Sequence, residues 1–159
     1  MYRKCVMAGW GDMDFNSHMR NTAYLDKSGD VRMMYFAENG FPMSEFIRLN
    51  IGPVVMKDEI EYFREVHLLE TLDVELGVAG LAEDGSRMLL QNRFFRPDGK
   101  EAARVTSAGG WLDLSARKLV PPPVVLLKVL NDMPRTDDFH VLPTSIRSTR
   151  GNQDADKSS

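Results

Sequence analysis

The feature that most restricts the fold is a strict alternation of apolar and polar residues near the middle of the chain. Its apolar members are Leu72, Val74, Leu76 and Val78. A period of two places these side chains on one face of a β-strand and the intervening polar residues on the other. The pattern therefore predicts a half-buried strand, which requires partner strands and a covering layer.

Further strands are predicted on both sides of this run. Residues 54–63, 88–95 and 101–114 are rich in the apolar and aromatic residues that favour strands. Turn-forming residues at 84–85 and 97–100 separate consecutive strands. We therefore expect an antiparallel meander of four strands. Two consecutive glycines, at 109 and 110, predict a bulge or the close approach of another backbone.

A long helix is predicted before the meander, from about Asn21 to Glu38. Tyr24 and Tyr35 belong to an apolar face at helical spacing, and Asn39-Gly40 supplies a typical helix end. Gly29 lies inside this helix at a propensity cost of about 1 kcal/mol relative to alanine, which is tolerable if another group packs closely there.

Shorter elements complete the predicted fold. We expect a first strand at 6–10, a short helix at 42–49 opened by Ser44 as a cap, and another helix at 124–130. The sum is an α+β domain with one helix on an antiparallel sheet. We expect this domain to span residues 1–143, followed by a polar tail at 144–159 that is disordered from 147.

Composition excludes several functional classes. The chain has 159 residues with a formal net charge of −3, so no global positive field is available for nucleic acid or an anionic membrane. No apolar run is long enough to span a bilayer or to form a secretion signal. Cys5 is the single cysteine and is expected to be buried, and no zinc-type cluster exists. These observations favour a cytoplasmic protein without a metal site.

The loop before the predicted helix concentrates polar chemistry. A calcium loop would use Asp12, Asp14 and Asn16, but Ser17 stands where glycine is needed and Ala23 where a bidentate glutamate is needed. A dinucleotide loop fails too, because Asp14 occupies the third glycine position and would repel a pyrophosphate. Both interpretations are therefore rejected.

A third interpretation fits better. Asp14 and His18 lie just before the helix, where unpaired N–H groups and the positive dipole end can polarise a carbonyl. Asp14 could then activate water or attack directly. A thioester suits this arrangement, because its thiol leaving group has a pKa of about 8.5 and departs without strong protonation.

These residues also carry a resemblance. The segment from Trp10 to Leu25 resembles the motif W-G-D-x-D-x-x-x-H-x-x-N-x-x-Y of hotdog-fold acyl-CoA thioesterases of the 4-hydroxybenzoyl-CoA thioesterase type. The resemblance implies that Asp14 is the catalytic carboxylate. By the same comparison, the residues that shape the substrate pocket are His18, Asn21 and Tyr24.

The resemblance covers about residues 2–118 and implies several properties. The fold would be a five-stranded antiparallel sheet wrapped around one long central helix. The activity would be hydrolysis of an acyl-CoA thioester to a free carboxylic acid and CoA-SH, without a cofactor. The assembly would be a homodimer or homotetramer, with the acyl site between subunits. Two departures from the family, Ser17 and Arg20, concern the loop conformation and the charge near the pocket.

Two alternatives remain open. One is a non-catalytic acyl-CoA-binding or sensor module on the same fold. The other is a hotdog dehydratase, which would need a helical acid such as Asp26 or Asp30.

Structural roles are expected for several other polar and sulfur-containing residues. Asp12 is expected to hold the loop, and His67 and His140 to have no chemical role. Methionines expected mainly to fill the core are Met33, Met34, Met43 and Met56. Basic residues that either meet CoA phosphates or line solvated strand edges are Arg93, Arg96, Arg104, Arg117 and Lys118.

Overall fold

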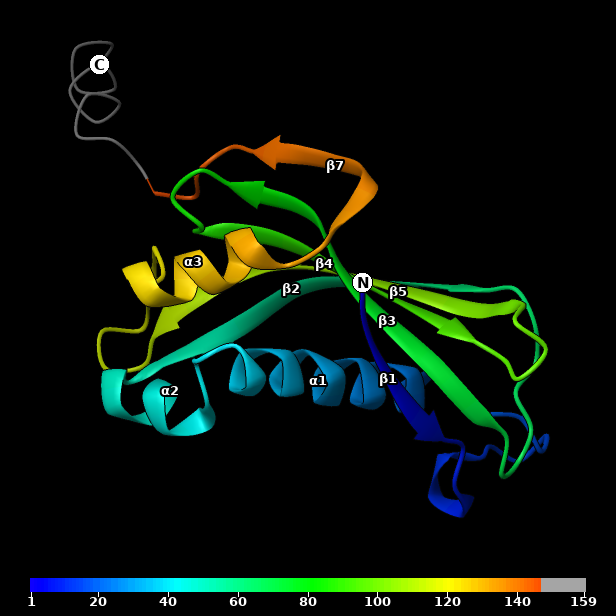
Figure 1. Cartoon of the computed structure of the whole chain (residues 1–159). Coiled ribbons are helices and arrows are strands. Elements are labelled where there is room, and N and C mark those ends of the chain that lie inside the picture. Colours follow the sequence, from blue (N-terminus) through cyan, green and yellow to red (C-terminus); the bar gives the residue numbers. More distant parts are fainter. Residues whose placement is uncertain (147–159) are drawn as a thin grey trace, which may run out of the picture.

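The computed structural model describes residues 1–146, and its elements are labelled in Figure 1. In chain order they are β1 (Tyr2–Met7), the short 3₁₀ helix η1 (Trp10–Asp12), α1 (Asn21–Glu38), α2 (Met43–Leu49), β2 (Ile51–Tyr62), β3 (Thr71–Ala82), β4 (Arg87–Phe95), β5 (Glu101–Asp113), β6 (Lys118–Val120), α3 (Val124–Asp132) and β7 (Arg135–Leu142). The α+β class predicted from the sequence is confirmed.

Within residues 1–146 the sheet has seven strands, so the expected count of five is too low. Its main path runs β1-β3-β4-β5-β2, with antiparallel pairing throughout. β6 adds to β5, and β7 runs parallel to the second half of β3. The predicted meander holds for β3, β4 and β5 only. β2 pairs with β5 instead of β3. It forms one edge of the main path, and β4 and β5 lie between it and β3.

The long helix is confirmed with the predicted bounds. α1 lies along one face of the sheet (Figure 1), and its buried side chains include Tyr24, Val31 and Phe36. It does not cover that face alone. The Tyr35 hydroxyl donates a hydrogen bond of 2.7 Å to the Val129 carbonyl, which joins α1 to α3. The two helices therefore share the apolar core.

Two glycines in the sequence have opposite surroundings. A Cβ at Gly109 would lie 2.2 Å from the Val54 carbonyl oxygen, so the predicted close approach of a second backbone is confirmed. A Cβ at Gly29 would meet no atom within 4 Å outside the neighbouring backbone of α1, so no close packing offsets the propensity cost of this glycine. The first glycine is required for the pairing of β5 with β2, whereas the second lies beside open space.

Several smaller expectations need correction. Pro42 rather than Ser44 occupies the N-cap of α2, and no side chain caps that helix. Cys5 is exposed, because it lies on the outward side of β1. Met33 is half-buried, but three of the four methionines expected in the core are exposed, namely Met34, Met43 and Met56.

The chain after β7 returns to the turn between β3 and β4. The Thr144 hydroxyl donates to Asp84 Oδ2 over 2.5 Å, and the Ser145 N–H donates to Ser86 Oγ over 3.1 Å. The predicted disorder of 147–159 lies outside the described residues. Within residues 1–146, no helix combines the length and apolarity needed to cross a membrane.

Candidate active site

The loop between η1 and α1 is closed by its own backbone. The Asp14 N–H donates to the His18 carbonyl over 2.7 Å, and Met13 and Met19 form an isolated β-bridge. Ser17 adopts a φ of 64°, a left-handed conformation that lets the chain reverse direction. Ser17, which stands where many members of the family have glycine, therefore adopts a backbone conformation that is strained for a residue with a side chain.

The Asp14 carboxylate is held by one of its two oxygens. Oδ1 accepts hydrogen bonds from the N–H groups of Asn16 (2.8 Å) and His18 (3.0 Å). Oδ2 accepts none from any residue in the described range 1–146, and the side chain is exposed. This geometry orients the carboxylate and leaves one oxygen free for a ligand or water.

Asp12 has the structural role that the sequence predicts. Its Oδ2 accepts the Gly9 N–H over 2.8 Å and forms an ion pair with Lys27 Nζ at 3.0 Å. Burial alone would raise the pKa of Asp12, but the Gly9 hydrogen bond and the Lys27 charge outweigh it and hold that pKa below its ordinary value. The residue therefore fastens η1 to α1 as a carboxylate.

A cleft of about 540 Å³ brings the four predicted site residues together. Asp14 and His18 come from the loop, and Asn21 and Tyr24 from the first turn of α1. The opposite wall consists of residues 62–66, at the end of β2 and just beyond it. The cleft therefore combines a carboxylate, an imidazole and a helix N-terminus.

The first turn of α1 supplies polar and aromatic groups to this cleft. Asn21 Oδ1 accepts the Thr22 N–H over 2.9 Å. Tyr24 is 2% exposed and meets Tyr62 and Phe94 edge-on, with ring centroids 5.7 and 5.2 Å away. Burial, with smaller contributions from Tyr62 and Glu70, raises the pKa of Tyr24 to about 12, so its hydroxyl is neutral at physiological pH.

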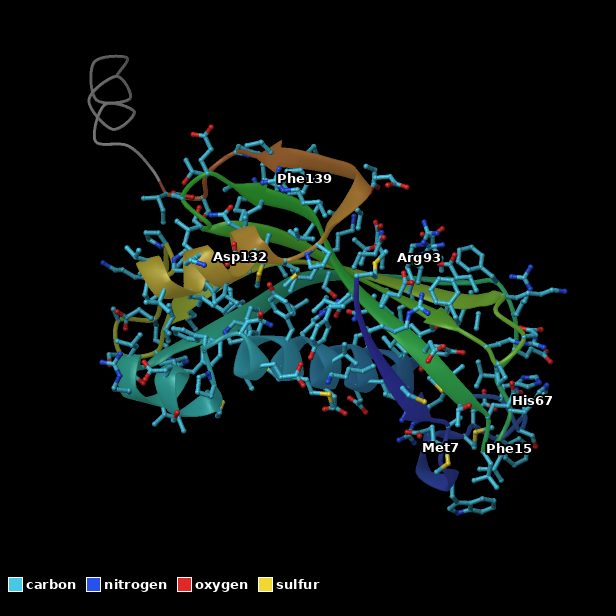
Figure 2. All side chains as sticks on the ribbon, in the orientation of Figure 1. Met7, Phe15, His67, Arg93, Asp132 and Phe139 are labelled. Atoms are coloured by element: carbon cyan, nitrogen blue, oxygen red, sulfur yellow. The ribbon has the colours of Figure 1, made fainter. Side chains whose placement is uncertain are left out.

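Sequence reasoning missed the wall formed by residues 62–66. Glu65 Oε2 lies 3.2 Å from His18 Nε2, and Val66 accepts the Met19 N–H over 3.0 Å. His67, for which no chemical role was expected, places its ring centroid 5.8 Å from that of His18. Figure 2 shows His67 and Phe15 at the same end of the molecule. No local sequence signal reveals this proximity, because it arises from the path of the chain after β2.

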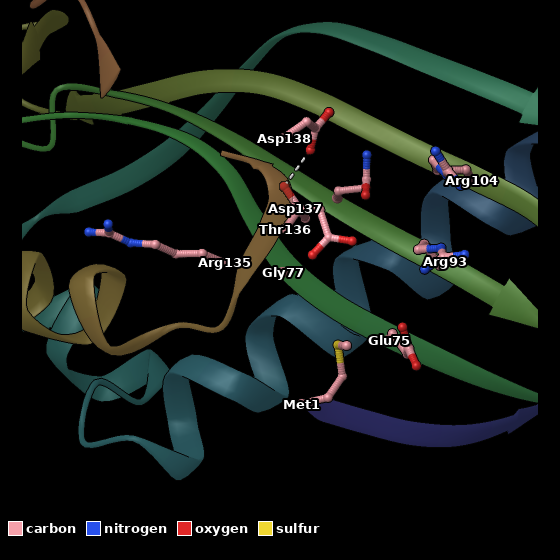
Figure 3. Close-up of a pocket in the computed structure, with 10 residues that line it drawn as sticks. Met1, Glu75, Gly77, Arg93, Arg104, Arg135, Thr136, Asp137 and Asp138 are labelled. Atoms are coloured by element: carbon pink, nitrogen blue, oxygen red, sulfur yellow. Dashed lines mark hydrogen bonds between the residues drawn. The ribbon is translucent and has the colours of Figure 1, made fainter. Parts of the chain in front are cut away.

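The basic residues fall into two groups. Arg20 and Arg64 line the cleft. Arg93 and Arg104 are instead both paired with Glu101, at 2.9 Å each. They line a separate cavity of about 400 Å³ beneath residues 135–138 at the start of β7, where carboxylates alternate with guanidinium groups (Figure 3). Neither arginine is thus free as a simple phosphate ligand.

The helical acids considered for a dehydratase lie outside the cleft. Asp26 is exposed, and Asp30 lines a third, mostly apolar pocket of about 230 Å³ farther along α1. Residues 1–146 also contain no group of histidine, cysteine and acidic side chains that could hold a metal ion. The acids that line the cleft are therefore Asp14, in the loop before α1, and Glu65 on the opposite wall.

Several solved structures have the same fold. A 1,4-dihydroxy-2-naphthoyl-CoA thioesterase from Synechocystis matches with a TM-score of 0.73 at 14% identity, covering 82% of this chain and 96% of that one. The probable thioesterase YbaW from Escherichia coli matches with a TM-score of 0.70 at 21% identity, covering 85% and 100%. A Staphylococcus aureus protein solved in complex with CoA matches with a TM-score of 0.73 at 17% identity, covering 85% and 87%.

The structural similarities show the fold, and a match to a family model shows the protein family. The model described as the thioesterase-like superfamily matches residues 8–130, which include η1, the Asp14 loop, α1 and the whole β3–β4–β5 meander. Because this match spans well over half of the chain, the protein belongs to the thioesterase-like superfamily and is a thioester hydrolase with the hotdog fold.

Proposed function

We propose that the protein is an acyl-CoA thioesterase that releases a free carboxylic acid and CoA-SH, with Asp14 as general base or nucleophile. The observation that carries this proposal is the free Oδ2 of Asp14 in a cleft beside the N-terminus of α1. The CoA bound to the Staphylococcus aureus protein and the activity of the Synechocystis enzyme are consistent with this substrate class.

Two routes lead from the thioester to the products, and Asp14 and water take part in both. As a base, Asp14 takes a proton from water while the resulting hydroxide attacks the thioester carbonyl. The tetrahedral intermediate then collapses, breaks the C–S bond and releases the thiolate, which is stable because thiols are acidic. As a nucleophile, Asp14 would instead attack the thioester carbonyl and expel the thiolate, and water would then hydrolyse the resulting mixed anhydride to the carboxylic acid and free Asp14.

The helix N-terminus is suited to the charge that develops during this reaction. At the start of α1 the Thr22 N–H donates to Asn21 Oδ1 and the Ala23 N–H donates to the Arg20 carbonyl, and the helix dipole favours a negative oxygen at this end. His18, Asn21 and Tyr24 line the same cleft, and we propose that they bind the substrate around the carbonyl. Arg20 and Arg64 add positive charge at the rim, which favours the anionic CoA group.

We also propose a homodimer or homotetramer in the cytoplasm. β2 is a long edge strand whose exposed apolar side chains include Val55, Met56 and Tyr62. A second copy would cover this edge and reduce the exposure of the neighbouring cleft. A single, exposed cysteine suits a reducing compartment.

The decisive experiment compares the wild type with Asp14→Asn. Thiol release from a panel of acyl-CoAs of varied chain length and aromatic character is followed with a chromogenic thiol reagent. We expect kcat to fall about 100-fold or more in Asp14→Asn, since proton transfer contributes at least this much. Asp26→Asn serves as the matched control, because Asp26 is an exposed acid of α1 outside the cleft.

The outcomes separate the possible functions. Equal turnover in the wild type and Asp14→Asn would remove Asp14 from the mechanism. Tight binding of acyl-CoA without any turnover by the wild type would favour a binding or sensor module. Loss of thiol release in Asp26→Asn alone would assign the essential acid to α1 instead of the loop.

A further inference from the structure

Glu65 lies in the cleft on the wall opposite the Asp14 loop. It belongs to the segment between β2 and β3, and its Oε2 lies 3.2 Å from His18 Nε2. The motif of the Asp14 loop gives this residue no role. In either the imidazolium or the Nε2–H tautomer, the ring can donate a hydrogen bond to this carboxylate. The Glu65 side chain therefore connects the two walls of the cleft.

His67 limits the position of the same imidazole from another direction. The two rings meet edge-on, with centroids 5.8 Å apart and planes at 60°. His67 is itself held, because its N–H donates to Glu70 Oε1 over 2.9 Å and the neighbouring Leu69 N–H donates to Ala8 over 2.7 Å. The support for His18 thus extends back to the end of β1.

A main-chain contact lies directly beside the side-chain contact. The Met19 N–H donates to the Val66 carbonyl over 3.0 Å. Residues 18 and 19 are therefore joined to residues 65 and 66 at two adjacent points. His18 is also one of the two main-chain donors that orient Asp14 Oδ1. A shift of His18 would consequently move the carboxylate that it orients.

We propose that Glu65 is a positioning residue: it holds the His18 imidazole against the far wall of the cleft, and the His18 main chain in turn holds Asp14 with Oδ2 free for the thioester. This role rests on the proposed function of Asp14. Glu65 contacts neither the scissile bond nor the attacking water, and acts only through His18.

The contact between Glu65 and His18 is too exposed to contribute much to the stability of the fold. The Glu65 side chain is 62% exposed and that of His18 is 37% exposed. Exposed pairs of this kind add little to the free energy of unfolding. Glu65→Ala should therefore leave the melting temperature unchanged while it alters the placement of His18 and Asp14.

The kinetic test uses two variants of Glu65. In Glu65→Ala we expect kcat to fall about tenfold with KM nearly unchanged, because a misplaced catalytic group affects the chemical step. Glu65→Gln keeps an acceptor oxygen for the His18 ring and should retain kcat within about threefold of the wild type. Glu83→Ala is the matched control, since Glu83 is an exposed glutamate in the turn after β3.

A double-mutant comparison tests whether Glu65 acts through His18. In a His18→Ala background, Glu65→Ala should have no further effect on kcat, because the group that it positions is absent. The same tenfold loss in both backgrounds would overturn the proposal. So would a rise in KM with unchanged kcat, which would indicate that Glu65 binds substrate directly.

A spectroscopic measurement tests the contact without relying on turnover. The chain has only three histidines, so their ring protons can be assigned by single substitutions. We expect a nuclear Overhauser contact between the His18 and His67 rings in the wild type and in Glu65→Gln, and its loss in Glu65→Ala. Retention of this contact in Glu65→Ala would contradict the proposal. If Asp14→Asn retains full activity, the proposed function fails, whatever the rings show.

Discussion

The conformation of one residue, Ser17, allows the Asp14 loop to close. Its φ of 64° lies in the left-handed region, which costs an L-residue about 1–2 kcal/mol. The strain is retained because the turn brings the Asp14 N–H to the His18 carbonyl and the His18 N–H to Asp14 Oδ1. The loop therefore sacrifices some stability to orient a carboxylate.

Replacing Ser17 with glycine should relieve this strain. We expect Ser17→Gly to raise the free energy of unfolding by about 0.5–1 kcal/mol, since the loss of strain exceeds the added entropy of the unfolded chain. Chemical denaturation monitored by circular dichroism measures the change. Asn16→Gly is the matched control, because Asn16 has no positive φ and should only lose stability. A destabilised Ser17→Gly protein would show that the Ser17 side chain compensates for its backbone.

The residues of the cleft differ in how far the sequence could predict them. Asp14, His18, Asn21 and Tyr24 lie within one local motif, and the cleft brings all four together. The opposite wall at 62–66 belongs to a segment far away in the sequence. Its place is decided by where β2 pairs and how the chain returns to β3, which no local spacing encodes. Contacts such as Glu65 with His18 are consequently visible only in the folded chain.

At the scale of elements, the period-two pattern predicts strands better than it predicts their partners. β3, β4 and β5 were expected in order because tight turns force neighbouring strands to pair. β2 has no tight turn to β3, so its partner depends on tertiary fit. Gly109 provides that fit, since the missing side chain lets the Val54 carbonyl approach β5. β7 was not predicted, because the short polar stretch that forms it lacks an apolar alternation.

Two glycine-to-alanine substitutions should therefore have opposite effects. In Gly109→Ala the new Cβ would lie 2.2 Å from the Val54 oxygen, and we expect a loss of about 3 kcal/mol or more, or failure to fold. In Gly29→Ala no atom lies within 4 Å of the new Cβ, and better helix propensity should add about 0.5–1 kcal/mol. Thermal melting of both variants beside the wild type checks the contrast. Equal melting temperatures for the two would show that β2 can move away from β5 without cost.

At the scale of the whole molecule, the two edges of the sheet are protected differently. One edge is shared along β3 by β1 and by β7, whose first residues line the cavity of about 400 Å³ together with Arg93 and Arg104 (Figure 3). The other edge is β2, twelve residues long, which pairs with no further strand within residues 1–146. Long unprotected edges invite pairing with another chain. The β2 edge is thus the better surface for the proposed second copy.

This asymmetry predicts which edge forms the dimer. Val55 on β2 is 50% exposed and Val141 on β7 is 61% exposed, so the same substitution can be compared on the two edges. Val55→Lys should convert a dimer into a monomer, because a charge would be buried where the apolar Val55 and Met56 of the two β2 edges meet, whereas Val141→Lys should leave the dimer intact. Light scattering coupled to gel filtration measures the mass of each protein. A dimer disrupted only by Val141→Lys would assign the interface to β7. A monomeric wild type would contradict the proposed oligomer.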